Sequence, residues 1–236
     1  MAKKIIKKAS TKTPIAAAVS PAVKRQHRTY AKELKRRDFR ITIFGSARIK
    51  PNDKIYKQVY DLAETIGKRG FDVITGGGPG LMEAANAGHD SGDKKDRSTN
   101  IGLGIRLPHE QYDNPHLEIK KHFNKFSARL DNFMALSSVV VVMPGGVGSC
   151  LEFFYTWQLI QVGHIHPIPI IMVGKMWKQL VKWIKKFPLK EGLIDKKEME
   201  CIHYAKNNKE AMKIIMKEHI LFKDGKEFSN ANYLKR

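Results

Sequence analysis

The chain has 236 residues, 42% hydrophobic and 28% charged, which is enough to bury the core of one domain. Its 43 Lys and Arg against 23 Asp and Glu leave a net charge of +20, and two cysteines exclude a disulfide framework. No apolar run approaches the ~18 residues that a membrane span needs. We therefore expect a cytoplasmic protein with no membrane partner.

The positive charge is concentrated at the N-terminus. Residues 1–40 carry thirteen basic side chains and two acidic ones, a net charge of +11. Residues 1–38 contain almost no large apolar side chains, which predicts a disordered basic arm with a helical stub near 30–37. Two interpretations stay open for this arm, weak nucleic-acid binding or a solvated charge run. The second is favoured because aromatic residues do not alternate with the charges.

From residue 39, short β-branched runs alternate with amphipathic segments. Residues 40–44 form the first such run, and 56–69 have apolar residues at helical spacing. Strands are then predicted over 71–75, 100–107, 138–143, 169–173 and 200–204, and helices over 81–88, 120–136, 149–162, 176–187 and 209–219. This alternation predicts an α/β fold, a Rossmann-like parallel sheet with helices on both faces. We expect a single domain over 39–222 and a polar tail over 223–236.

Two glycine-rich turns follow predicted strands and precede predicted helices. They are 76–80 (Gly-Gly-Gly-Pro-Gly) and 144–148 (Pro-Gly-Gly-Val-Gly). Ligands of open parallel sheets bind beyond the carboxyl ends of the strands, where free N–H groups at a helix start attract anions. Neither turn has the dinucleotide fingerprint or the Walker A sequence. The alternative, tight turns without a ligand, is less favoured because two such turns lie on one edge.

Four side chains near these turns allow two interpretations each. Ser149 and Glu152 have the spacing of a capping box, or they contact a phosphate and a sugar. Arg129 lies at the edge of an apolar helix face, so it either extends to the surface or points into the cleft. Glu83 either caps its helix or faces the nucleotide.

The glycine turns and their surroundings resemble the LOG (Lonely Guy) family, whose members have long been labelled lysine decarboxylases. The resemblance rests on Arg129 and three motifs at 76–84, 107–111 and 144–152, the last of which matches the signature PGGxGTxxE. It covers about residues 39 to 187.

The resemblance implies a homodimeric phosphoribohydrolase that uses no metal or organic cofactor. Such an enzyme acts on a nucleoside 5′-monophosphate, as an AMP nucleosidase does, and releases ribose 5-phosphate and a free base such as adenine or a cytokinin. Glu152 would be the catalytic glutamate and Arg129 its partner. The 5′-phosphate would lie on Gly145, Gly146, Val147, Gly148 and Ser149. The other expected nucleotide-binding residues are Gly76, Gly77, Gly78, Gly80, Glu83, Gly45 and Ser46.

Three positions depart from the family pattern. Leu130 replaces a lysine, Ser149 replaces a threonine, and Tyr155 replaces a frequent second glutamate. The changes at 130 and 155 remove one cation and one carboxylate. They leave open an altered substrate, or a non-catalytic protein that binds or carries a nucleotide or phosphorylated cofactor.

Overall fold

The computed structural model describes residues 28–107, 112–225, 230 and 232–235. One seven-stranded sheet, parallel throughout, has the order β4-β3-β2-β1-β5-β6-β7. The strands are β1 Arg40–Phe44, β2 Asp72–Thr75, β3 Asn100–Ile105, β4 Ile119–Phe123, β5 Val139–Val142, β6 Ile170–Val173 and β7 Ile202–Ala205. The predicted fold class is confirmed.

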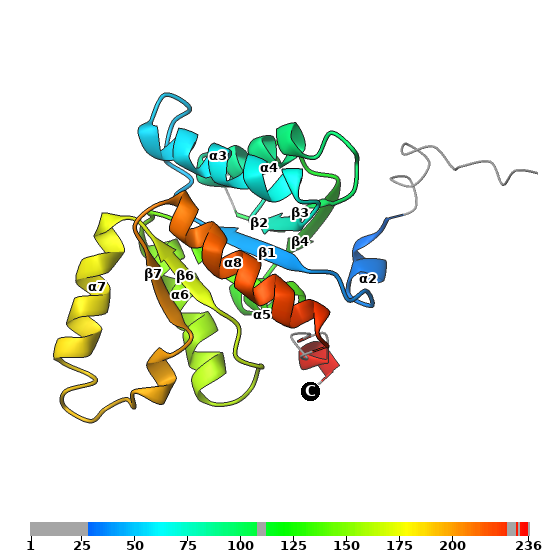
Figure 1. Ribbon diagram of the computed structural model, residues 1–236. Coiled ribbons are helices and arrows are strands. Elements are labelled where there is room, and N and C mark those ends of the chain that lie inside the picture. Colours follow the sequence, from blue (N-terminus) through cyan, green and yellow to red (C-terminus); the bar gives the residue numbers. More distant parts are fainter. Residues whose placement is uncertain (1–27, 108–111, 226–229, 231, 236) are drawn as a thin grey trace, which may run out of the picture.

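Helices cover both faces of the sheet (Figure 1). Helices α3 (Lys54–Lys68), α4 (Leu81–Gly92) and α8 (Asn208–Lys223) pack on one face, and α5 (Phe126–Leu136), α6 (Val147–Gln161) and α7 (Lys175–Lys186) on the other. The central strands are therefore buried on both sides, as the unbroken run of valines in β5 requires. None of the described helices combines the length and apolar character needed to cross a membrane.

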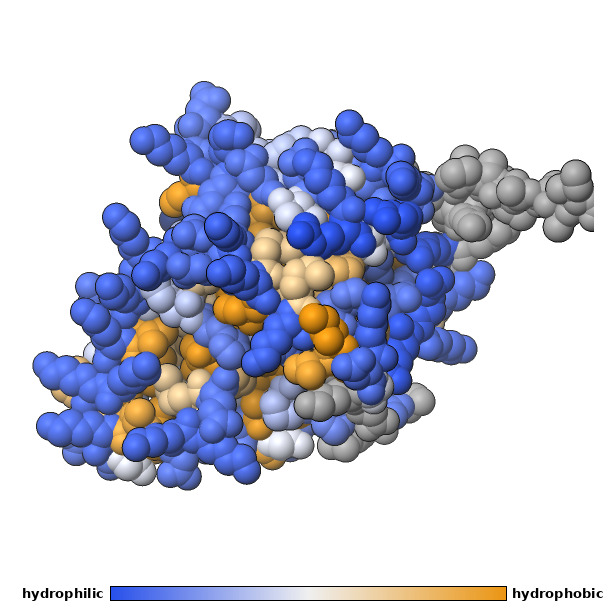
Figure 2. Space-filling model, viewed as in Figure 1, coloured by the Kyte–Doolittle hydropathy of each residue, from blue (hydrophilic) through white to orange (hydrophobic). Residues whose placement is uncertain are grey.

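The outer surface is mostly hydrophilic (Figure 2), as expected for a chain with 28% charged residues. Figure 2 shows that hydrophilic side chains cover most of the face seen in Figure 1, with apolar side chains between them near α7. On α7, Trp177 is buried whereas Trp183 is 51% exposed. The helix therefore packs through one side only.

The structure corrects the prediction of one helix over 120–136. Residues 119–123 instead form the edge strand β4, which pairs with β3, and the helix begins at Phe126. The three-residue spacing of Phe123 and Phe126 is compatible with one continuous helix and also with a strand followed by a helix. The structure forms the strand because residues 119–123 pair with β3, and the local sequence period does not reveal that pairing.

Helix α4 continues four residues beyond the predicted end at Gly88. A Cβ at Gly88 would lie only 2.2 Å from the carbonyl oxygen of Tyr60 on α3. This glycine therefore allows the two helices to pack closely and does not end α4.

Described segments near each end of the chain, at Tyr30 and Tyr233, contact α5. Residues 28–38, which the sequence assigned to the arm, include the short helix α2 (Tyr30–Glu33), and the Tyr30 hydroxyl is hydrogen-bonded to Asn132. In the tail, the short 3-10 helix η2 (Tyr233–Lys235) brings the Tyr233 hydroxyl within 2.9 Å of Asp131. Residues 1–27, the rest of the predicted arm, lie outside the described residues. The domain limits stay a prediction.

Candidate active site

Three turns meet at the carboxyl ends of β2, β1 and β5, where the strand order reverses. Ser46, two residues after the end of β1, links the other two turns through its backbone. Its N–H donates to the carbonyl of Pro144 (3.2 Å), and its carbonyl accepts from the N–H of Leu81 (3.0 Å). The two glycine turns therefore lie on either side of β1, at the position where open α/β sheets bind ligands.

A buried amide network holds the 76–80 turn. Asn114 donates from its side chain to the carbonyls of Gly77 (3.1 Å) and Gly78 (3.2 Å). It also donates to Asn86, which accepts from Thr75 and donates to Asn100. We did not predict these residues. Asn86 and Asn100 are marked locally only as amides within a helix and a strand, and Asn114 lies in a loop before β4.

Gly76 makes room for the Arg129 side chain. A Cβ at Gly76 would lie 2.3 Å from Nη2 of Arg129 and 2.6 Å from the sulfur of Met82. The guanidinium therefore lies directly over the glycine backbone. A Cβ at this position would have to displace these side chains because of the close approach, and not because of the φ angle of Gly76.

Arg129 and Glu152 form a buried ion pair. Nη1 of Arg129 lies 3.6 Å from Oε1 of Glu152, and their side chains are only 10% and 12% exposed. Arg129 also donates through Nε to the carbonyl of Leu103 (2.6 Å), and its guanidinium lies over the ring of Phe133. The structure thus resolves the two interpretations of Arg129, because the side chain points inward.

Burial changes the proton affinity of both members of this pair. It raises the pKa of Glu152 to about 7, and the positive charge of Arg129 opposes that rise. Burial also lowers the pKa of Arg129, against the effect of Glu152. A carboxyl group with a pKa near neutrality can accept or release a proton under physiological conditions.

The start of α6 is open to an anion. The first N–H groups of a helix have no intrahelical acceptor, and no side chain caps them here because the N-cap is Gly146. A Cβ at Gly146 or at Gly148 would meet nothing within 4 Å. At Gly145 a Cβ would instead lie 2.1 Å from Oγ of Ser149, a buried side chain. The 144–148 turn therefore combines free N–H groups with open space above them.

Of the two interpretations of Ser149 and Glu152, the structure excludes the capping box. The helix begins at Val147, so Ser149 is its third residue and Glu152 lies one turn further along. Neither side chain caps the helix. Glu83 does not cap α4 either, since Gly80 is the N-cap there without a side-chain hydrogen bond. The Glu83 carboxylate accepts a hydrogen bond from Tyr112 at 3.4 Å.

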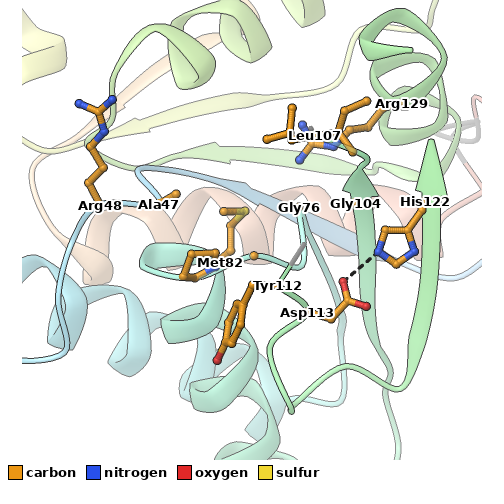
Figure 3. A pocket seen from close by; sticks show the side chains of 13 residues that line it. Ala47, Arg48, Gly76, Met82, Gly104, Leu107, Tyr112, Asp113, His122 and Arg129 are labelled. Carbon is orange, nitrogen blue, oxygen red and sulfur yellow. Dashed lines mark hydrogen bonds and ion pairs between the residues drawn. The ribbon is translucent and has the colours of Figure 1, made fainter. Parts of the chain in front are cut away.

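A cavity of about 570 Å³ lies beside the 76–80 turn. Among the predicted site residues, Gly76, Gly78 and Arg129 line it (Figure 3). The other lining residues are Ala47, Arg48, Pro79, Met82, Gly104, Ile105, Leu107, Tyr112, Asp113 and His122.

Other predicted site residues lie behind or beside this cavity. Gly45 packs against Leu81, and Gly80 has a φ of +69° and packs against Ser46. Gly77, Glu83, Glu152 and residues 145–149 are also absent from the cavity wall. Glu152 is connected to the cavity through Arg129. Within the 107–111 motif, residues 108–111 lie outside the described part of the chain.

Leu130 and Tyr155, which replace the lysine and the second glutamate of the family pattern, do not line the cavity. Leu130 is buried with 3% exposure, and Tyr155 donates a hydrogen bond to Asp131. Tyr233 of the C-terminal segment binds the same carboxylate. Tyr155 therefore helps to hold the tail on α5.

One group of carboxylates in the described residues has the spacing of metal ligands. It comprises Glu33, Asp38 and Asp72, at the opposite end of the sheet from the glycine turns. The guanidinium of Arg40 lies among them, 2.9 Å from Glu33, 3.1 Å from Asp38 and 3.4 Å from Asp72. Arginine thus supplies the positive charge at this position.

Comparisons with known proteins identify similar chains. A family model described as "Possible lysine decarboxylase" matches residues 82–215. A curated relative, the pyrimidine/purine nucleotide 5′-monophosphate nucleosidase of Escherichia coli K12, is 24% identical over 140 residues. That match covers 57% of this chain but only 30% of the relative.

Two solved structures have a similar fold. The molybdenum cofactor binding protein of Rippkaea orientalis has a TM-score of 0.57 at 19% identity, over 76% of this chain and 96% of that chain. The molybdenum cofactor carrier protein of Chlamydomonas reinhardtii has a TM-score of 0.56 at 19% identity, over 78% of this chain and 99% of that chain. At this identity the similarity shows the fold alone.

Proposed function

We propose that this chain, which belongs to the family described as "Possible lysine decarboxylase", hydrolyses the N-glycosidic bond of a nucleoside 5′-monophosphate. The family model covers more than half of the chain, and the resemblance to the LOG family is thereby confirmed. The curated relatives named as nucleotide 5′-monophosphate nucleosidases support this substrate class. The proposed products are ribose 5-phosphate and a free base such as adenine or a cytokinin.

The observation that carries the proposal is the buried Arg129–Glu152 pair beside the cavity. Cleavage of an N-glycosidic bond develops positive charge on the ribose, as glycoside hydrolysis does. A carboxylate close to the sugar stabilises that charge and orients the attacking water. Glu152, with its pKa raised to about 7, can accept the proton that this water releases.

The remaining features support a place for each part of the nucleotide. The open start of α6, with Gly146, Gly148 and Ser149, suits the 5′-phosphate because its N–H groups are free. The cavity beyond Arg129 suits a planar base, since Met82 and Leu107 give it apolar walls. Phosphate binding would then supply the energy that positions the sugar at Glu152.

A homodimer is part of the proposal. Val147, Leu151 and Phe154 form a stripe along α6 and are 87%, 45% and 39% exposed. Three apolar residues at this spacing form one face of a helix, and burial against a second copy would remove that face from water. The stripe begins at the glycine turn, so the partner would lie close to the proposed phosphate site.

A second candidate is a non-catalytic carrier of a nucleotide or phosphorylated cofactor. The solved structures of similar fold include a molybdenum cofactor carrier and a molybdenum cofactor binding protein. Such a protein would use the same glycine turns without bond cleavage. The location of Leu130 and Tyr155 away from the cavity weakens the argument that these departures removed the activity.

Release of adenine from AMP distinguishes the two candidates. For an enzyme, the wild-type chain releases adenine, and Glu152→Gln still binds AMP but loses about 100-fold or more in kcat. Glu64→Gln on α3 removes a carboxylate that pairs with Lys68 at the surface and should leave the rate unchanged. If the chain binds AMP but releases no base from AMP or from any other nucleoside monophosphate, the result would support the carrier.

A further inference from the structure

A histidine–aspartate pair forms part of the cavity wall. Nε2 of His122, on strand β4, lies 3.0 Å from Oδ1 of Asp113 in the preceding loop. The two side chains are 33% and 29% exposed, and both line the cavity that also contains Arg129 (Figure 3). Neither His122 nor Asp113 takes part in the Arg129–Glu152 ion pair.

The fold holds this pair at the cavity from two sides. Gly104 on β3 is the register partner of His122, and a Cβ at Gly104 would lie 2.7 Å from Cδ2 and 3.0 Å from Nε2 of the imidazole. The ring therefore lies across a glycine. Asp113 precedes Asn114, which binds the carbonyls of Gly77 and Gly78, so its position is tied to the glycine turn.

Within this pair, His122 is the group that can donate a proton. An ionised carboxylate only accepts hydrogen bonds, so Nε2 of His122 donates to Asp113. Lys120, on the same strand, lies 3.9 Å from the other carboxylate oxygen of Asp113. Histidine is the side chain that most often transfers protons near neutral pH.

Hydrolysis of the proposed bond needs such a group. When the bond from C1′ to the ring nitrogen breaks, the electron pair goes to the base, which leaves most easily if one of its nitrogens takes up a proton. The guanidinium of Arg129 does not release its proton. Glu152 must accept a proton from the attacking water, so a second group has to protonate the base.

We propose that the Asp113–His122 pair is the proton donor to the departing base. This inference rests on the proposed function. In the protonated imidazole Nε2–H stays bonded to Asp113, and the Nδ1 proton moves to a ring nitrogen of the base as the glycosidic bond breaks. Water adds to C1′ and its proton goes to Glu152. The proton on Glu152 and the neutral imidazole then exchange with solvent, which restores both groups.

The test compares two leaving groups in one site. Adenine of AMP needs a proton to leave, whereas 4-nitrophenolate of 4-nitrophenyl ribofuranoside 5-phosphate leaves without one. For His122→Gln we expect kcat on AMP to fall about 100-fold or more, with kcat on the nitrophenyl substrate within about threefold of wild type. Asp113→Asn should show the same split with a smaller loss.

The control is His116→Gln. His116 belongs to the same loop, pairs with Asp90 at 3.4 Å and does not line the cavity, so both rates should stay unchanged. Retained nitrophenolate release also shows that each variant is folded. Equal losses on both substrates, or no loss on AMP, would overturn the role of the pair while leaving the proposed hydrolysis intact. A wild-type chain that releases neither leaving group would overturn the hydrolysis, and the proton donor with it.

Discussion

Replacement of Gly76 by alanine tests whether the close approach of Arg129 matters for function. The new Cβ would lie 2.3 Å from Nη2 of Arg129, whereas ordinary contacts are about 3.5 Å, so the guanidinium must move by about 1 Å. Nε is held by the carbonyl of Leu103, so this movement changes the geometry toward Glu152. A misplacement of about 1 Å costs about 100-fold in rate, or about 2.7 kcal/mol in transition-state binding.

The assay is kcat/KM for AMP, measured as adenine release, in a double-mutant cycle with Arg129→Ala. If Gly76→Ala acts through the guanidinium, it should lower kcat/KM about 100-fold in the wild-type chain and less than about threefold when Arg129 is absent. Thermal unfolding of each variant checks that the fold is retained. The reasoning is refuted if Gly76→Ala keeps wild-type activity, or if it causes the same loss in both backgrounds.

Four further predictions concern other parts of the chain. Because burial raises the pKa of Glu152 to about 7 and hydrolysis needs its carboxylate, kcat/KM should rise about tenfold per pH unit as the pH approaches about 7 from below. A flat profile between about pH 5 and about pH 8 would contradict this role. Arg40→Ala leaves Glu33, which is fully buried, without its closest cation, so chemical denaturation should show a loss of about 3–5 kcal/mol in unfolding free energy. A loss below about 1 kcal/mol would mean that the cluster adds little. Leu151→Glu should convert a dimer to a monomer in light scattering, and an unchanged mass would rule out the α6 stripe as the interface. If residues 1–27 bind nucleic acid, oligonucleotide affinity should fall steeply with salt and disappear on their deletion; affinity that survives the deletion would assign binding elsewhere.

The sequence alone was sufficient for the class of fold and for the location of the glycine turns. Apolar runs such as 138–143 are buried on both faces, and that local composition already predicts a parallel strand. The turns follow those runs directly, so their place at the carboxyl edge of the sheet followed from chain order. Gly76 and Gly145 were identified in this way, although the reasons for glycine there, Arg129 and Ser149, were not.

Only the tertiary structure decided which side chains meet. Strand β4 was predicted as part of a helix, because an edge strand is defined by pairing with β3 and not by its own period. The sequence therefore does not mark His122 as a site residue, because its position at the cavity depends on the pairing of β4 with β3 at Gly104. The direction of the Arg129 side chain and its distance to Glu152 depend on how α5 and α6 pack on the sheet. Contacts between residues distant in the chain form only when the sheet is assembled, so no local pattern encodes them.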